Sequence, residues 1–481
     1  MLTLLYPHCS NRSAVLRALE RAILFDRSCL HLPHPTAIRP SSIYSGSIYR
    51  IALTGAIAGL LFGFDVGIVN GALLPLRSYF ALSEVQVEFA ASSLLYGCLF
   101  GAMAAGTLSD RTGRRTVLRL GGLFYLASAI FAAISATFVE FMMARFVGGL
   151  GVGLGITIAP LYLAEVSPRE KRGSLVTFNQ IALVTGILLG YTINLALRAL
   201  GVGNWRWMFG SAAIPALVFI VGLFFVPESP RWLFQQKRVQ ETESALFAVG
   251  GEAHRSQQLH EFGQAITQES PAPGWMGRLR RPLIIAMMIA ALQQITGINA
   301  VLYYGSLLFV THGNSGSDQR AFAANVLIGV TNLVFTLVAL LIIDRIRRRT
   351  LLTGSVAAML AALLLLIFAF RHAHPYFPLV VVSTMLYVAA FAIGLGPGAW
   401  LYMAEIFPTN VRGRAMSIAT AVLWISCILV SSSFLTLLRA FGPAGAFGVF
   451  AGVSAFAVVF FSRLPETRGK SLEDIQHLWK P

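Results

Sequence analysis

Twelve long apolar stretches constrain this chain more than any other feature of its sequence. Each is roughly 20 residues long or longer, which is the length that an α-helix needs to cross the hydrocarbon core of a bilayer. In lipid, a helix is the only open-chain structure that satisfies its own backbone hydrogen bonds. We therefore expect an all-α membrane protein with twelve transmembrane helices. The stretches are 51–76, 89–109, 117–138, 141–164, 174–197, 206–226, 282–311, 321–343, 350–371, 376–404, 413–438 and 443–463.

Composition and charge agree with this class. Hydrophobic residues make up 56% of the 481 residues and charged residues only 12%, whereas soluble domains are about 25% charged. The formal net charge of +16 could indicate a nucleic-acid partner. With the N-terminus placed inside, however, most Lys and Arg residues fall in the termini and the even-numbered connections, as the positive-inside rule requires. The charge therefore predicts two cytoplasmic termini and no nucleic-acid partner.

Short motifs recur in the same order in the two halves of the sequence. The run 110–115 is echoed by 344–349, and the run that begins at Glu165 is echoed by the run that begins at Glu405. Parallel repeats of this kind are typical of transporters that bind their substrate between two halves. We predict a basic N-terminal extension, an N-terminal six-helix half, a cytoplasmic linker with short helices, a C-terminal six-helix half and a cytoplasmic tail, at 1–46, 47–230, 231–281, 282–466 and 467–481.

One acidic residue, Asp65, lies inside the first apolar stretch. A carboxylate at membrane depth costs roughly 2.5–3.5 kcal/mol on insertion scales, so it normally faces a partner or a polar cavity and marks an ion or proton pathway. The alternative is an Asp that only fixes helix packing. We find no cluster of metal ligands and no nucleophile–base set in the sequence, so we expect neither a metal site nor an enzyme.

Six motifs together identify a family resemblance. The chain resembles the sugar porters of the major facilitator superfamily from about residue 50 to 475. The resemblance implies the major facilitator fold, with twelve transmembrane helices in two pseudo-symmetric halves, and it implies transport of a monosaccharide across the lipid bilayer. The motifs lie at 106–115, 145–153, 227–233, 293–299, 396–400 and 465–469.

Amides and aromatic residues form the predicted sugar site. A sugar is neutral and rich in hydroxyl groups, and amide side chains both donate to hydroxyls and accept from them. Five amides lie in apolar stretches, although Asn332 could instead bond between helices. The resemblance implies that four of these amides and one tryptophan contact the sugar, and that three more aromatic residues line the site. The predicted substrate-binding residues are Gln180, Gln293, Gln294, Asn299, Tyr303, Asn332, Trp400, Trp424 and Phe62.

The predicted proton-coupling pair is Asp65 and Arg145. In the passive glucose carriers of the family, an amide usually occupies the position of Asp65. Burial disfavours the charged form of a carboxyl group and a nearby cation favours it, so a pair that forms and separates during the cycle binds and releases a proton. We hypothesise that protonated Asp65 releases Arg145 and permits an outward-facing, sugar-binding state, and that deprotonation toward the cytoplasm restores the pair. Protons are the expected coupling ion, and no cofactor is expected.

Two positions depart from the best-known bacterial sugar–proton symporters. Leu423 replaces a polar amide, which leaves the substrate open among hexoses, pentoses and polyols. Ala212 replaces a buried acid that has been linked to proton movement, which weakens any relay that needs two carboxylates.

Charged residues at the cytoplasmic ends of the helices form the predicted gate. By resemblance, they make salt bridges across the halves that close the inside when the outside is open. An exposed pair is worth only about 0–1 kcal/mol, so such a gate needs a network; for the arginines, the alternative is a topology signal alone. Arg347 replaces the glycine of the second motif, so a less tight turn is expected there. The predicted gating residues are Asp110, Arg111, Arg115, Glu165, Arg172, Asp344, Arg345, Glu405 and Arg412.

The resulting prediction is proton-coupled uptake of a monosaccharide by alternating access, by a monomer in the inner (plasma) membrane. The alternatives are a passive sugar or polyol carrier in which Asp65 is structural, and a sugar sensor built on the same fold. The glycine run 148–153 has the spacing of a phosphate-binding loop, but it lies inside a spanning stretch with no preceding strand.

Overall fold

The computed structural model describes residues 47–167, 172–201, 203–265, 275–312, 318–371 and 376–468, which form helices and short connections without any strand. By length and composition, this part of the chain contains twelve segments that could cross a membrane. The predicted fold class is therefore confirmed. The N-terminal extension 1–46 and residues 469–481 of the predicted tail lie outside the described residues.

The N-terminal half consists mostly of unbroken helices. Its first five spans are single helices, and the sixth is interrupted at Ala212. The elements are α2 (Ser47–Phe80), α3 (Glu84–Thr112), α4 (Arg114–Ile134), α5 (Phe138–Val166), α6 (Arg172–Leu197), η2 (Arg198–Leu200), α7 (Asn204–Ser211) and α8 (Ala213–Gly222).

Three helices lie in or at the start of the predicted linker; two are short, as expected, whereas α10 has 27 residues. They are α9 (Pro230–Gln235), α10 (Val239–Ala265) and α11 (Trp275–Arg278). The Ser229 hydroxyl caps α9 by accepting from the Trp232 amide. The indole of Trp232 donates to the Asp110 carbonyl at 2.9 Å, and this bond fastens α9 to the N-terminal half.

The C-terminal half contains several broken spans. The seventh is divided into α12 and α13, and the tenth carries a π-helical turn, η3, between α16 and α17. The elements are α12 (Arg280–Ile295), α13 (Ile298–His312), α14 (Asp318–Ile342), α15 (Arg348–Arg371), α16 (Phe377–Ala390), η3 (Phe391–Leu395), α17 (Gly396–Glu405), α18 (Thr409–Ser431) and α19 (Phe434–Ser462).

Two predicted stretches of the C-terminal half are continuous in the sequence pattern but interrupted in the structure. Between α12 and α13, Gly297 has φ 101°, and a Cβ at this position would stand 2.6 Å from the Phe450 ring; only glycine suits this conformation and this space. The predicted stretch 413–438 is also interrupted, because α18 ends at Ser431. Within α19, Gly442 has φ 67° and ψ 174°, so α19 is two helical segments on either side of this residue.

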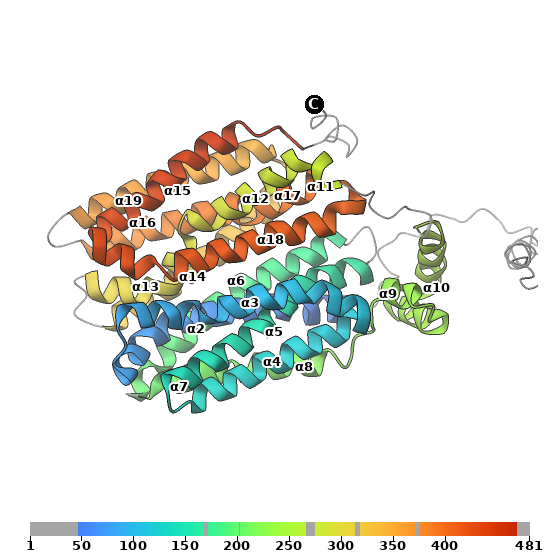
Figure 1. Cartoon of the computed structure of the whole chain (residues 1–481), viewed down its shortest axis with the longest axis horizontal. Coiled ribbons are helices and arrows are strands. Elements are labelled where there is room, and N and C mark those ends of the chain that lie inside the picture. Colours follow the sequence, from blue (N-terminus) through green and yellow to red (C-terminus); the bar gives the residue numbers. More distant parts are fainter. Residues whose placement is uncertain are drawn as a thin grey trace, which may run out of the picture. The chain divides into compact units, whose positions relative to one another are not determined.

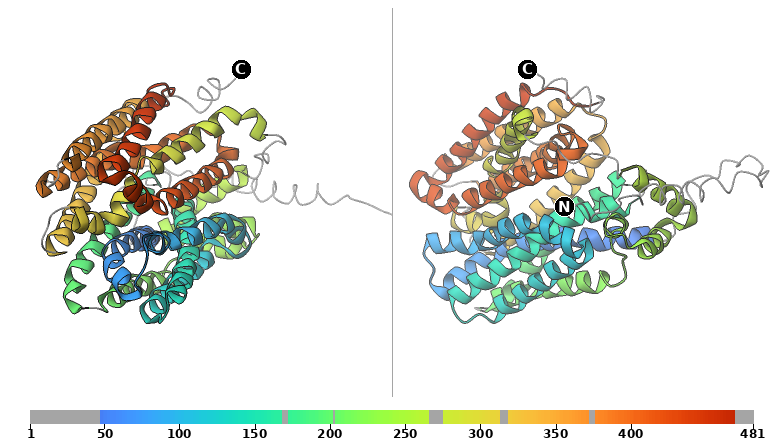
Figure 2. Two further views of the ribbon diagram at one scale, coloured as in Figure 1. Left: turned by 60° about the vertical axis from the view of Figure 1, so that its left-hand side comes forward. Right: turned by 45° about the vertical axis from the view of Figure 1, so that its right-hand side comes forward.

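The two halves form two adjacent bundles, which Figure 1 colours blue to green and yellow to red; both views of Figure 2 separate them. Across the boundary, α13 packs on α2, α14 on α6 and α18 on α3. One end of the bundles carries α9 and α10 (Figure 1). We call this the linker end, and the opposite end, where α2 connects to α3, the far end.

Glycines bring helix backbones into direct contact inside the N-terminal half. A Cβ at Gly63 of α2 would stand 1.8 Å from the Leu183 carbonyl oxygen of α6, and one at Gly149 of α5 would stand 2.0 Å from the Leu94 carbonyl oxygen of α3. Small residues permit this close approach in membrane helices. The glycine run after Arg145 is accordingly a helix-packing face.

Candidate functional site

A buried ion pair joins α2 to α5. The guanidinium of Arg145 makes two parallel hydrogen bonds to the Asp65 carboxylate, and Nη2 lies 2.9 Å from Oδ2. Arg145 is 2% exposed and Asp65 is 3% exposed. The guanidinium also lies over the Phe209 ring, 5.1 Å from its centroid. Bidentate pairing of this kind is strong and geometrically specific, and it joins the two residues that the sequence analysis paired.

Three of the predicted amides meet at the break between α12 and α13. Gln293 donates to the Gly396 carbonyl at 2.8 Å, and Gln294 donates to the Gln293 side chain at 3.5 Å. Asn299 donates to the Gln294 side chain and lies 3.1 Å from the sulfur of Cys427. All three amides are buried, so the break presents a connected set of hydrogen-bonding groups. Cys427 was not among the predicted site residues.

Aromatic residues from both halves bring further polar atoms into the same region. The rings of Phe62 on α2 and Trp424 on α18 meet edge to face, with centroids 5.5 Å apart. Trp424 and Tyr303 are 3% and 1% exposed. Among the described residues, the Trp424 indole nitrogen and the Tyr303 hydroxyl have no hydrogen-bond partner. An unpaired buried polar group costs about 1–3 kcal/mol, so these two groups are suited to a polar ligand.

The remaining predicted binding residues are not joined to this set. Within the described chain, no hydrogen bond links Gln180 of α6 or Asn332 of α14 to the amides of α12 and α13; Gln180 is half-buried and Asn332 is 5% exposed. Trp400 of α17 is 36% exposed. Their place at the site stays a prediction.

Hydrogen bonds close the far end of the site by joining the two halves. Asn70 of α2 donates to the Leu302 carbonyl of α13 at 2.8 Å and accepts from the Ser306 amide at 3.1 Å. The Tyr191 hydroxyl of α6 donates to the same Leu302 carbonyl at 2.9 Å. Asn70 was not among the predicted site residues, although an asparagine inside an apolar stretch is a signal of the same kind as Asp65.

At the linker end, the ion pairs lie within each half. Arg114 pairs with Glu165 at 2.9 Å and with Asp110 at 3.2 Å. Arg348 pairs with Glu405 at 3.1 Å and with Asp344 at 3.4 Å. No ion pair connects the two halves anywhere in the described ranges, so the expected bridges between them are not formed in this conformation. In this conformation the halves are hydrogen-bonded to each other at the far end, so salt bridges at the linker end are not required to hold them together.

The arginines that form these pairs are not the predicted ones. Arg115 donates to the Val226 carbonyl at 2.9 Å, and Arg412 donates to the Phe407 carbonyl at 3.2 Å. Arg111 and Arg345 are exposed. Arg172 is the first residue of α6, and its side chain lies outside the described side chains. Arg114 and Arg348 could have been found by their spacing, because each follows its acid by four residues, one helical turn.

Equivalent contacts recur in the two halves. Glu228 accepts from the Arg114 amide at 2.9 Å, and Glu466 accepts from the Arg348 amide at 2.9 Å. Likewise, the Tyr162 hydroxyl donates to the Pro227 carbonyl at 2.7 Å, and the Tyr402 hydroxyl donates to the Pro465 carbonyl at 2.9 Å. The pseudo-symmetry that the sequence repeats predicted therefore extends to individual hydrogen bonds.

Comparison with known proteins agrees with this architecture. The family model described as "Sugar (and other) transporter" matches residues 51–479. The chain is 34% identical over 439 residues to the glucose transporter GlcP of Staphylococcus epidermidis, covering 89% of this chain and 96% of that protein. It is 32% identical over 477 residues to the D-xylose-proton symporter of Escherichia coli, covering 91% of this chain and 96% of that protein.

A solved structure gives the same result. The partially occluded inward-open conformation of the xylose transporter XylE from E. coli superposes with a TM-score of 0.79 at 31% identity, covering 89% of this chain and 100% of that chain. Another XylE structure, described as that of a major facilitator superfamily proton:xylose symporter, matches with a TM-score of 0.77. The chain therefore belongs to the family of sugar (and other) transporters, with the fold of the major facilitator superfamily.

Proposed function

We propose that this protein takes up a monosaccharide, a hexose or a pentose, together with a proton by alternating access. The observation that carries the proposal is the buried pair of Asp65 and Arg145 in a protein whose amides and unpaired aromatic polar groups gather between two halves. Relatives named as arabinose-proton and xylose-proton symporters support the same reading. We place the protein in the plasma (inner) membrane as a multi-pass monomer with both termini in the cytoplasm, so the linker end faces the cytoplasm.

The coupling mechanism follows from the charges of the pair. When Asp65 is ionised, the two side chains neutralise each other and can stay buried. When Asp65 is protonated, the guanidinium loses its counter-charge, and the bond between α2 and α5 weakens. In the present conformation the pair is formed and the far end is closed by Asn70 and Tyr191. This combination fits the stage of the cycle after the proton has left toward the cytoplasm.

The amides of α12 and α13 are proposed to bind the sugar hydroxyls. Gln293, Gln294 and Asn299 already satisfy one another, so a sugar enters a connected network rather than isolated donors. Tyr303 and Trp424 contribute the hydroxyl and the indole N–H that lack partners among the described residues. Gln180, Asn332, Trp400 and Phe62 complete the proposed site. The acids and arginines of the linker end are proposed to form bridges between the halves when that end closes.

Uptake into vesicles tests the proposal. Purified protein in proteoliposomes, offered a panel of labelled hexoses, pentoses and polyols, is expected to accumulate at least one of them when the outside is made acidic, and a protonophore is expected to remove that accumulation. Sugar entry that is indifferent to the imposed pH gradient would leave only the passive carrier.

A passive carrier is the second candidate, and one observation favours it. At the break between α7 and α8, Ala212 offers no carboxyl group, and the Nε of Arg145 has no hydrogen-bond partner among the described residues. A coupling relay with a second acid beside Arg145 is therefore absent from the described site. In this alternative Asp65 only neutralises Arg145, and transport runs with the sugar gradient.

Tyr303→Phe separates a binding role from a structural one. Because the Tyr303 hydroxyl is buried without a partner, its removal is expected to leave thermal stability unchanged or slightly raised. Loss of one hydrogen bond to the sugar, about 1 kcal/mol, is expected to weaken affinity about fivefold.

The matched control is Tyr304→Phe. Its hydroxyl donates to the Ser431 carbonyl, so this variant is expected to lose stability while it keeps its affinity for sugar. Ligand binding by tryptophan fluorescence and thermal melting in detergent measure the two effects. Unchanged sugar affinity in Tyr303→Phe would remove Tyr303 from the site.

A further inference from the structure

The break between α18 and α19 leaves backbone groups that need partners. The residue at the N-cap position of α19 is Ser433, and its side chain makes no capping bond. Its hydroxyl instead donates back to the Leu429 carbonyl at 2.6 Å. The first N–H groups of a helix have no acceptor within the helix, and a buried backbone group without a partner is costly; Phe434 and Leu435 at the start of α19 are buried. The start of α19 therefore requires an acceptor from elsewhere.

That acceptor comes from the opposite half of the protein. Glu88 on α3 accepts from the Thr436 amide at 2.7 Å and from the Thr436 hydroxyl at 2.9 Å. Thr436 is the third residue of α19, the position whose N–H an N-cap side chain normally binds. Glu88 is 2% exposed, and a carboxylate is favoured at the positive end of a helix. Glu88 thus caps α19 in place of Ser433.

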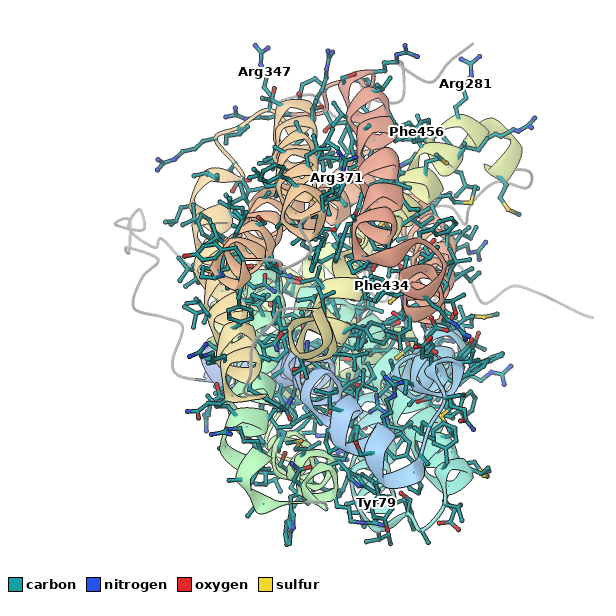
Figure 3. All side chains as sticks on the ribbon, turned by 90° about the vertical axis from the view of Figure 1, so that its left-hand side faces the viewer. Tyr79, Arg281, Arg347, Arg371, Phe434 and Phe456 are labelled. Carbon is teal, nitrogen blue, oxygen red and sulfur yellow. The ribbon has the colours of Figure 1, made fainter. Side chains whose placement is uncertain are left out.

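On the other side of the break, the C-terminal end of α18 finds a hydrogen-bond donor within the C-terminal half. The Ser431 carbonyl accepts from the Tyr304 hydroxyl of α13. Figure 3, viewed from the far end, shows Phe434 of α19 in the C-terminal half near its boundary with the blue N-terminal helices. At this break, the Ser431 carbonyl therefore finds its partner within the C-terminal half, and the Thr436 amide finds its partner, Glu88, in the N-terminal half. Of the hydrogen bonds that join the halves in the described chain, only those of Glu88 involve a carboxylate.

We propose that Glu88 is a latch for the far end, a positioning residue that caps α19 from the opposite half and sets how often this end opens. Opening separates α3 from α19. The Thr436 amide then loses its acceptor, and Glu88 loses both of its donors. The free energy of this one contact therefore enters the equilibrium between the closed and open far end directly, and a change at Glu88 shifts the populations of the two states.

Distances between spin labels test the latch. Nitroxides are placed at Val139 of α5 and Phe441 of α19, which are 66% and 63% exposed and belong to opposite halves. Cys9 and Cys29 are replaced by serine, whereas Cys98 and Cys427 are buried. The labelled protein is studied in lipid nanodiscs by double electron–electron resonance. This measurement needs neither sugar nor a proton gradient, so its failure is distinct from failure of the proposed function.

Glu88→Gln is the test variant, because it keeps one acceptor oxygen and loses the charge. Hydrogen bonds to charged groups are about twice as strong as neutral ones, so we expect the long-distance population to rise about fivefold over the parent protein. Thr436→Val, which removes only the hydroxyl donor, is expected to raise it about threefold. If Glu88→Gln does not fold, Thr436→Val alone tests the proposal.

Glu140→Gln is the matched control. Glu140 lies at the same end of the same half and completes the capping box of α5 by accepting from the Thr137 amide at 3.2 Å, but its contacts stay within its own half. This variant is expected to leave the distance distribution unchanged. A distribution in Glu88→Gln or Thr436→Val that matches the parent, or an equal shift in Glu140→Gln, overturns the latch.

Discussion

Asp65→Asn is expected to abolish accumulation of sugar against its gradient while leaving exchange of sugar across the membrane. The asparagine cannot take up or release a proton, so sugar movement loses its link to the proton gradient. Its amide oxygen still accepts from Arg145, whose guanidinium also keeps its contact with the Phe209 ring. The variant should therefore fold and still change conformation when sugar is present on both sides.

Paired assays in proteoliposomes measure this effect. With coupling of one proton per sugar, a pH difference of one unit supports about tenfold accumulation, and Asp65→Asn is expected to bring the inside and outside concentrations to equality. Counterflow of labelled sugar, which needs no proton gradient, serves as the control for folding and binding. Persistent uphill uptake in this variant would show that another group carries the proton.

Arg145→Met is expected to cause the largest loss of stability. The substitution leaves the Asp65 carboxylate buried without its bidentate donor. Breaking a buried ion pair by removing one partner costs about 3–5 kcal/mol, because an uncompensated charge remains in a low-dielectric environment. We expect a marked fall in melting temperature in detergent and a reduced yield of folded protein from membranes.

The double variant Asp65→Asn with Arg145→Met tests the cause of this loss. It removes both charges, so its stability is expected to exceed that of Arg145→Met alone, a non-additivity that is typical of residues in direct contact. Transport by the double variant should be passive at most. Equal instability of the single and double variants would mean that Arg145 acts through packing rather than through its charge.

The sequence was sufficient for the fold and for the central pair. Twelve apolar stretches leave few alternatives to a bundle of helices, because lipid supplies no hydrogen bonds to the backbone. Asp65 and Arg145 are separated by 80 positions, yet an acid and a base that each lie within an apolar stretch have few other ways to be neutralised. The adjacent amides Gln293 and Gln294 were also predictive, because polar side chains inside an apolar stretch need hydrogen-bond partners.

Contacts that depend on helix ends could not be read from the sequence. Glu88 directly precedes the predicted stretch 89–109 and was given no role, although α3 begins at Glu84. Which arginine of a basic run points inward depends on where the helix starts, and this is why Arg114 was missed. The break after Ser431 falls at three consecutive serines inside the predicted stretch 413–438, and its position depends on partners from other helices.

The uneven distribution of helix breaks predicts unequal stiffness in the two bundles. Backbone contact at Gly63 and Gly149 leaves little space between the N-terminal helices. In the C-terminal bundle, helices are interrupted at Gly297, at the π-helical turn and before α19, and the π-helical turn contacts Gln293, one of the amides proposed to bind sugar. The N-terminal bundle should therefore act as a rigid frame, and bending should concentrate in the C-terminal bundle. Substitutions intended to change which sugar is accepted are best placed at these helix breaks.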